Sequence, residues 1–220
     1  MKATAVLPIK RFARAKTRVV EAIGPPGRAA VLRAMLGDVL IALENAREVE
    51  RVILITGEGR AEKIAMEHAK RGTTPFEVLR DPADHGHSEA ATLGIIRAKA
   101  LGAERTALLP GDCPLIDPGE LDAAISGLNE RTVGVATDRH GTGTNGLFLS
   151  PADAIGPAFG PGSRERHLDR ARRAGYTAED LEIPSLALDL DTPDDLDALA
   201  SLLADEPERA PLTAAALAEL

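Results

Sequence analysis

Apolar β-branched runs alternate along the chain with stretches in which apolar positions recur every three or four residues. The first run covers Ala3–Ile9, and the first helical stretch covers Gly27–Ala46. Short continuous apolar runs are typical of strands buried on both faces, and the longer spacing is typical of helices. Further strands are predicted at Arg51–Thr56, Phe76–Asp81, Thr106–Asp112, Thr132–Asp138, Gly146–Ser150 and Leu186–Asp191. Further helices are predicted at Ala61–Arg71, Glu89–Leu101, Pro118–Leu128, Ser163–Ala174 and Pro193–Leu203.

This alternation predicts a single Rossmann-like α/β domain over residues 1–205, with a mostly parallel central sheet and helices on both faces. Residues 206–220 are rich in Ala, Leu and Glu and contain two prolines, so this tail is expected to be a docked helix or a frayed end. In such sheets ligands bind beyond the carboxyl ends of the strands. The candidate segments for function are therefore 8–18, 81–88, 110–112, 138–145 and 189–191.

Aspartates follow two of the predicted strands. Asp112 ends LLPGD, and Asp189 and Asp191 lie in LDLDTPDD. Alternation along a strand sends Asp189 and Asp191 to one side, where two carboxylates repel each other unless a cation lies between them. Strand-ending aspartates also cap helices, and Asp191 is a candidate cap because Pro193 follows it. Three carboxylates are nevertheless the oxygen-rich set that Mg²⁺ prefers, so we predict a magnesium site.

Positive charge is concentrated in the loop after the first strand, although the chain has a net charge of −8. This loop contains Lys10, Arg11, Arg14, Lys16 and Arg18. Such side chains, together with N–H groups at a helix N-terminus, can hold a triphosphate. The loop lacks the GxxxxGK[ST] pattern, so it is not a P-loop. A solvated basic turn is the alternative for Arg11 and Arg14.

Two glycine-rich loops offer backbone N–H groups and hydroxyls. Gly141–Phe148 leads into a strand, and Phe159–His167 leads into a helix for which Ser163 is the predicted N-cap. A phosphate or carboxylate of a small acid would suit such loops, although GPGS is also an ordinary helix entry. A further segment, DHGHSEA, contains His85 and His87, which have no acidic or cysteine partner at a spacing that would support a metal site. That segment is better explained as a nucleotide-contacting loop than as a zinc site.

Composition excludes several classes of protein. The acidic balance argues against a nucleic-acid partner, and four Phe, one Tyr and no Trp give no platform for stacking bases. The single cysteine, Cys113, excludes an intramolecular disulfide and fits a reducing, cytoplasmic compartment. The N-terminal apolar run of about five residues is too short for a signal segment or a membrane span.

The chain resembles the CofC/FbiD family in five motifs and in their order. The motifs are LPIKRFARAKTR, LLPGDCPLI, GTGTNGLF, FGPGS and LDLDTPDDL. These are the guanylyltransferases that make the phospholactyl or phosphoenolpyruvyl arm of coenzyme F420. The likeness spans Ala3 to about Leu203. It implies a MobA-like fold and a reaction in which a small phosphorylated acid attacks the α-phosphate of GTP and releases pyrophosphate. The acid would be phosphoenolpyruvate, 2-phospho-L-lactate or 3-phosphoglycerate.

The resemblance also implies roles for individual residues. Asp112, Asp189 and Asp191 would hold Mg²⁺, and Asp112 and Lys16 would be catalytic. The phospho-acid would contact Lys16, Thr144, Gly160 and Ser163. The nucleotide would contact Pro8, Lys10, Lys16, Ser88, Pro110 and Gly111. Many relatives have Leu-Asn at the helix start where this chain has His87-Ser88, and a serine offers a hydroxyl in place of an amide.

Two alternative functions remain at this point. Another MobA-like nucleotidyltransferase or a nucleotide-sugar-dependent transferase would keep the fold, but the first loop lacks the Gly-Gly pair typical of those nucleotidyltransferases. A non-catalytic nucleotide-binding module would not need the three aspartates and Lys16. The long apolar helix Val31–Leu43 is expected to carry more apolar surface than one sheet face covers, which would favour a homodimer contact.

Overall fold

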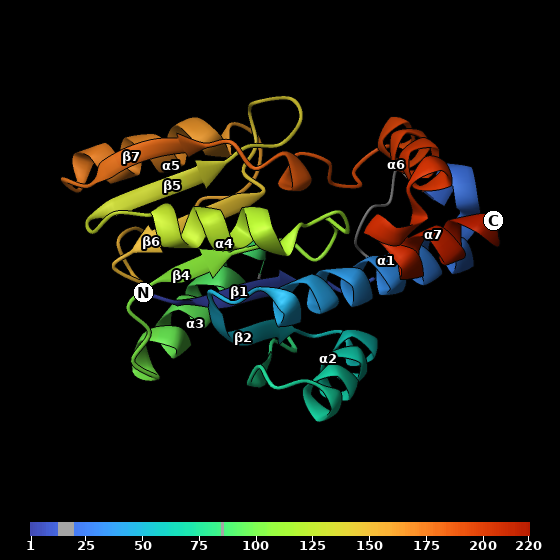
Figure 1. Cartoon of the computed structure of the whole chain (residues 1–220), viewed down its shortest axis with the longest axis horizontal. Helices are drawn as coiled ribbons and strands as arrows, with labels where there is room; N and C mark the ends of the chain where they lie inside the picture. The colour runs from blue at the N-terminus through green and yellow to red at the C-terminus, as the bar shows by residue number, and fades with distance from the viewer. Residues whose placement is uncertain (13–19, 85) are drawn as a thin grey trace.

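The computed structural model describes residues 1–12, 20–84 and 86–220. Within these ranges, seven strands form one sheet in the order β3-β2-β1-β4-β6-β5-β7 (Figure 1). The strands are β1 (Ala3–Ile9), β2 (Val49–Thr56), β3 (Phe76–Arg80), β4 (Thr106–Leu108), β5 (Thr132–Ala136), β6 (Gly146–Ser150) and β7 (Thr177–Leu181). Neighbouring strands are parallel except for β6, which is antiparallel to both β4 and β5. The predicted α/β fold is confirmed.

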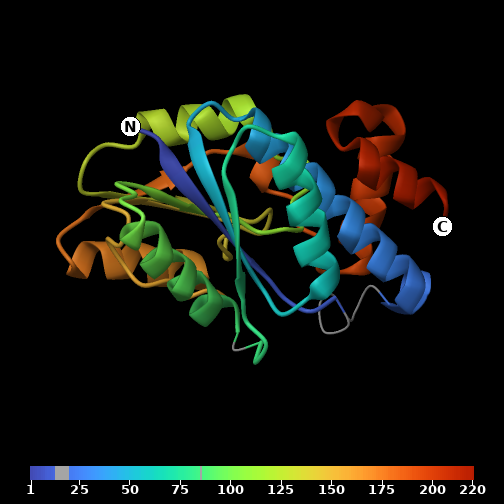
Figure 2. The same cartoon turned by 90° about the horizontal axis from the view of Figure 1, so that it is seen from below.

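Helices cover both faces of this sheet (Figure 2). They are α1 (Val20–Asn45), α2 (Gly59–Arg71), α3 (His87–Ala100), α4 (Pro118–Gly127), α5 (Ser163–Arg173), α6 (Pro193–Asp205) and α7 (Pro211–Ala218). Helices α1, α2 and α4 pack on one face, and α3 and α5 pack on the other. Successive residues of β1 alternate between the two cores: Ala5 and Leu7 belong to the first and Val6 to the second. Burial on both faces explains the continuous apolar runs.

Glycine and proline set the approach of two helices. In α1, Gly24 has a φ of 68°, and Pro25 and Pro26 follow it, so the helical path is interrupted there. In α3, a Cβ on Gly94 would lie 2.3 Å from a methyl of Val6. Only a residue without a side chain permits this contact, which lets α3 pack close to β1.

One predicted strand is wrong, and one strand was not predicted. Residues Pro184–Leu186 form a 3₁₀ turn (η2), and the segment after it, to Asp191, is not a strand. Leu186 and Leu190 are apolar because they are buried in the core, not because they join a ladder. The seventh strand is instead Thr177–Leu181, paired with β5 at the edge of the sheet. An edge strand needs little apolar sequence, so TAEDL gives no strand signal.

The C-terminal tail contains helix α7, which packs against α1. The buried carboxylate of Asp38 on α1 accepts hydrogen bonds from the backbone N–H groups of Leu212 and Thr213, at 3.1 and 2.8 Å, and from the Thr213 hydroxyl at 2.6 Å. Burial raises the pKa of Asp38, although these hydrogen bonds oppose the shift. Part of the apolar surface of α1 is therefore covered by the chain itself, and the homodimer stays a prediction. No helix within the described ranges has the length and hydropathy of a membrane span.

Candidate active site

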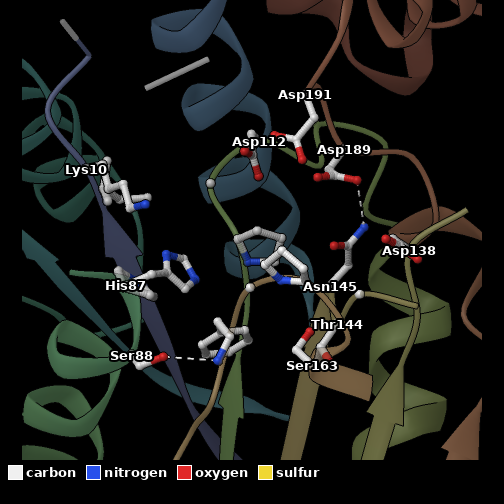
Figure 3. A pocket seen from close by; sticks show the side chains of 18 of the residues that line it. Lys10, His87, Ser88, Asp112, Asp138, Thr144, Asn145, Ser163, Asp189 and Asp191 are labelled. Atoms are coloured by element: carbon white, nitrogen blue, oxygen red, sulfur yellow. Dashed lines mark hydrogen bonds between the residues drawn. The ribbon is translucent and has the colours of Figure 1, made fainter. Parts of the chain in front are cut away.

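A pocket of about 730 Å³ lies beyond the carboxyl ends of β1, β4 and β5 (Figure 3). Each predicted site residue that falls within the described ranges lines it. These residues are Pro8, Lys10, Ser88, Pro110, Gly111, Asp112, Thr144, Gly160, Ser163, Asp189 and Asp191. Lys16, together with Arg14 and Arg18 of the same loop, lies outside the described residues. The pocket thus joins segments from opposite ends of the sequence, such as Pro8 and Asp191.

One side of the pocket, the strand wall, follows directly from the parallel ladder. It consists of Pro8, Ile9, Lys10, His87, Ser88, Glu89, Pro110, Gly111 and Asp112. Strands β1 and β4 pair through Val6 and Leu108, so the residues that follow them emerge side by side. A Cβ on Gly111 would lie 2.3 Å from the Cδ1 atom of Ile9, so the two segments approach closely. Helix α3 begins here, and no side chain among the described residues caps its N-terminus, a position that favours anions.

The other side, the loop wall, consists of Asp138, Thr142, Gly143, Thr144, Asn145, Phe159, Gly160, Pro161, Ser163, Asp189 and Asp191. Thr144 and Asn145 precede β6, which runs antiparallel to β4 and β5. The start of β6 therefore lies at the same sheet edge as the ends of its neighbours. The N-cap of α5 is Gly162, with a φ of 69°, and Ser163 is the first helical residue, so the predicted cap is corrected by one position.

Asn145 explains how Asp189 reaches the pocket without a strand. Its buried side-chain amide donates to the Leu186 carbonyl at 2.8 Å and to Oδ1 of Asp189 at 3.2 Å (Figure 3). The backbone N–H of Arg139 also donates to the Ala187 carbonyl at 2.8 Å. These bonds tie residues 139–145 to residues 186–189. Sequence reasoning missed Asn145; its signal is an amide directly before a buried strand.

Asp195 fixes the backbone beside Asp191. The buried Asp195 carboxylate accepts from the N–H groups of Asp191 and Thr192, at 3.0 and 2.7 Å, and forms an ion pair with Arg139 at 2.5 Å. Burial raises the pKa of this carboxyl, but the hydrogen bonds and the charge of Arg139 outweigh burial, so the pKa lies below its ordinary value. The N-cap of α6 is Thr192, in a capping box with Asp195. The predicted capping role of Asp191 is therefore wrong.

Ser88 connects the two walls. Its hydroxyl oxygen accepts a hydrogen bond from the backbone N–H of Phe159 at 3.0 Å (Figure 3). The Phe159 ring also meets the His87 ring edge to face, with centroids 4.6 Å apart. The Ser88 oxygen thus anchors the glycine-rich loop, while its hydroxyl proton is left to donate elsewhere.

The pocket is acidic in its described part. The carboxylates that line it are those of Glu89, Asp112, Asp138, Asp189 and Asp191. Among the described lining residues, Lys10 alone is a lysine or an arginine. An anionic ligand needs additional positive charge in such a place. No three His, Cys, Asp or Glu side chains of residues 1–12, 20–84 and 86–220 are grouped closely enough to hold a metal ion by themselves. Asp112, Asp189 and Asp191 nevertheless all line the pocket, and Mg²⁺ commonly takes one or two carboxylates and completes its shell with water and substrate phosphates.

Comparison with known proteins identifies the family. The model of the family described as guanylyl transferase CofC like matches residues 3–205. The chain belongs to this family. A Conexibacter woesei protein named phosphoenolpyruvate guanylyltransferase is 42% identical over 206 residues, which cover 93% of this chain and 90% of the relative. The predicted resemblance is confirmed.

Two solved structures agree with the fold. A Desulfovibrio desulfuricans G20 protein assigned to the nucleotide-diphospho-sugar transferases superposes with a TM-score of 0.76 at 19% identity, covering 100% of this chain and 95% of its own. A nucleotidyl transferase from Methanothermobacter gives a TM-score of 0.61 at 19% identity, covering 93% of this chain and 99% of its own. This chain therefore shares its overall fold with both structures.

Proposed function

We propose that this CofC-like protein is a guanylyltransferase that transfers GMP from GTP to a small phosphorylated acid and releases pyrophosphate. Phosphoenolpyruvate is the first candidate acid, because a relative that shares 42% of the aligned residues carries that substrate in its name. The observation that carries the proposal is the convergence of the acidic strand end, the uncapped helix starts and the glycine-rich loops on one pocket. Two anionic substrates and a cation would meet there.

GTP is proposed to bind at the strand wall. Lys10, the backbone at Pro110 and Gly111, and the N-terminus of α3 offer positive charge and N–H groups to its phosphates. Phe12, Leu32 and Leu36 add apolar side chains to the lining of the same pocket, and Leu36 lies next to Gly111 of this wall. Such a mixture of apolar surface and a few oriented polar groups is typical of nucleotide pockets.

The acid is proposed to bind at the loop wall. Thr144 and Ser163 offer hydroxyls, and the left-handed backbone at Gly160, with a φ of 105°, exposes peptide groups. Within the described part of the chain, no side chain caps the start of α5. Together these groups suit a phosphate and a carboxylate on one small molecule.

The proposed reaction is an in-line displacement at the α-phosphorus of GTP. A phosphate oxygen of the acid forms the new P–O bond, and the bond between the α-phosphorus and the bridging oxygen breaks, so pyrophosphate leaves with the electron pair. The acceptor oxygen is already anionic at neutral pH, so no general base is required. Asp112, Asp189 and Asp191 would hold Mg²⁺, which when bound supplies positive charge to the reacting phosphates. Lys16, outside the described residues, is proposed to contact both substrates.

A substrate matrix tests the proposal. GTP, ATP and CTP are each combined with phosphoenolpyruvate, 2-phospho-L-lactate and 3-phosphoglycerate, with Mg²⁺ or with EDTA, and pyrophosphate release is followed. The highest rate is expected for GTP with phosphoenolpyruvate in Mg²⁺, and mass spectrometry should show the acid joined to GMP through a diphosphate. Pyrophosphate release from none of the nine pairs would refute the guanylyltransferase proposal.

We also propose coenzyme F420 biosynthesis as the pathway, because the resemblance of the motifs is to enzymes that make its activated arm. The cytoplasm is the proposed compartment, since the chain has a single cysteine, Cys113, which is buried and not part of a disulfide.

A further inference from the structure

His167 is buried behind the loop wall and does not line the pocket. It lies on α5, and none of its surface is exposed. Its Nε2 atom is 2.8 Å from the backbone nitrogen of Ala158, and its Nδ1 atom is 3.0 Å from the hydroxyl oxygen of Thr144. One imidazole therefore contacts both loops that form the wall.

The first of these contacts determines which ring nitrogen carries the proton. A backbone N–H can only donate, so Nε2 of His167 must accept the hydrogen bond from Ala158. In a neutral ring the proton is then on Nδ1, and Nδ1–H donates to the oxygen of Thr144. The Thr144 oxygen is thereby an acceptor on its buried side.

The hydroxyl proton of Thr144 consequently has to find its own acceptor elsewhere. Thr144 lines the pocket, so this proton can be directed to a ligand. With the opposite tautomer of His167, Thr144 would donate to the ring and present its lone pairs to the pocket, where they would repel a phosphate. The tautomer decides whether the pocket offers an anion a donor or an acceptor at this position.

The surroundings of the ring keep it neutral. The pKa of His167 is lowered to about 4, chiefly by burial and in addition by the positive charges of Arg170 and Arg166. From the other elements the ring faces Thr144, Ala158 and the edge of Phe159, none of which titrates. Arg166 is itself directed to the carbonyls of Ala158, Phe159 and Gly160, so the same helix turn also holds the glycine-rich loop.

We propose that His167 is a positioning residue whose Nδ1–H group fixes the Thr144 hydroxyl as a hydrogen-bond donor to the phosphate of the acceptor acid. This inference rests on the proposed function, since it needs an acid at the loop wall. It goes beyond a contact role for Thr144, because a residue outside the pocket sets which way that hydroxyl donates.

Two substitutions separate the two ring contacts. In His167→Gln the side-chain oxygen can still accept from Ala158, but the donor to Thr144 is lost. In His167→Asn the amide nitrogen occupies the Nδ1 position and can still donate to Thr144, while the acceptor for Ala158 is lost. We expect His167→Gln to raise the KM for phosphoenolpyruvate roughly tenfold or more, with the KM for GTP changed by less than about twofold. His167→Asn should bind the acid several-fold tighter than His167→Gln.

Thr144→Val closes a double-mutant cycle with His167→Gln. Because both changes remove the same donor, the double variant should have the KM for phosphoenolpyruvate of Thr144→Val alone. An unchanged KM for phosphoenolpyruvate in His167→Gln would overturn the inference, and so would effects of the two substitutions that multiply. If the wild-type protein still turned over, the proposed function would stand in either case.

A measurement on the unaltered protein keeps the inference testable even if a variant fails to fold. Long-range ¹H–¹⁵N spectra of the ¹⁵N-labelled protein at pH 7 should show His167 protonated at Nδ1 and bare at Nε2. Protonation at Nε2, or at both nitrogens, would overturn the inference and leave guanylyl transfer untouched. The proposed function itself falls if wild type releases no pyrophosphate in the substrate matrix, and the assignment of the acid falls with it.

Discussion

The two walls of the pocket are built in different ways. At the strand wall, Pro110, Gly111 and Asp112 are positioned by the backbone ladder between β1 and β4, and by close packing at glycine. At the loop wall, the backbone is irregular, and buried polar side chains such as Asn145 and His167 hold it by hydrogen bonds to distant loops. The first wall should therefore be sensitive to added volume and the second to lost hydrogen bonds or to protonation. Four predictions test this difference, starting with the largest effect.

Asp112→Asn should reduce kcat by about 10²–10³-fold, because it removes a carboxylate from the proposed cation site while conserving shape. The free energy of unfolding should barely change, since Asp112 is only half buried and the ladder holds its backbone. Pyrophosphate release and urea unfolding give the two readings. Asp205→Asn, at an exposed position at the end of α6, is the matched control. If Asp112→Asn kept a kcat near that of wild type in Mg²⁺, Asp112 would not belong to the proposed cation site.

Acid should weaken the protein through the loop wall. The pKa of His167 is lowered from 6.5 to about 4 in the folded state, so the unfolded chain takes up this proton first. The neutral His167 ring stabilises the folded state fully above pH 6.5, and this stabilisation is lost as the pH falls to about 4. The loss amounts to about 3 kcal/mol of the free energy of unfolding. Urea unfolding at several pH values would measure it. His167→Gln should lose this part of the pH dependence, and equal slopes in both proteins would contradict the assignment.

Gly94→Ala should destabilise the protein by about 2 kcal/mol, because the new methyl would meet Val6 at 2.3 Å and Ile55 at 2.7 Å. The shift of α3 should also raise the KM for GTP, since His87 and Ser88 begin this helix. Gly127→Ala at the end of α4, where a Cβ meets nothing within 4 Å, is the control. Equal thermal unfolding of the two variants would show that helix packing does not set the strand wall.

Gly160→Ala should cost about 1 kcal/mol of stability, because its φ of 105° strains any residue with a side chain. The KM for the acid should rise as well, since Gly160 lines the pocket. Gly102→Ala carries a similar strain, with a φ of 86° and open space around it, but lies outside the pocket. Both variants should therefore lose comparable stability, and only Gly160→Ala should change acceptor kinetics. If Gly160→Ala and Gly102→Ala had the same KM for the acid, Gly160 would have no part in acid binding.

The strand wall was largely predictable from sequence, because its residues stand directly after buried apolar runs. The apolar strands β1 and β4 give that signal by themselves, although β4 ends at Leu108 and not at Asp112 as predicted. The edge strand at Thr177–Leu181 gives none, because it is half exposed. Asp189 and Asp191 were assigned to the pocket through a strand that does not exist.

The supporting groups of the loop wall could not be read from sequence, because their partners are remote. The Asn145 amide forms a hydrogen bond with Asp189, 44 positions away. The His167 ring forms one with Thr144, 23 positions away. Neither spacing leaves a local pattern. Lys16 stays a prediction, since it lies outside the described residues.

The contact between α7 and α1 has a consequence for synthesis on the ribosome. Asp38 and Thr213 are 175 positions apart, so at about 5–20 residues per second the partner of this carboxylate emerges roughly ten to thirty seconds after it. During that interval the flank of α1 beside Gly37, which Leu212 later covers, is open to water and to chaperones. A premature stop codon shortly before Pro211 would make this exposure permanent and favour aggregation, even though every residue lining the pocket would already have been made.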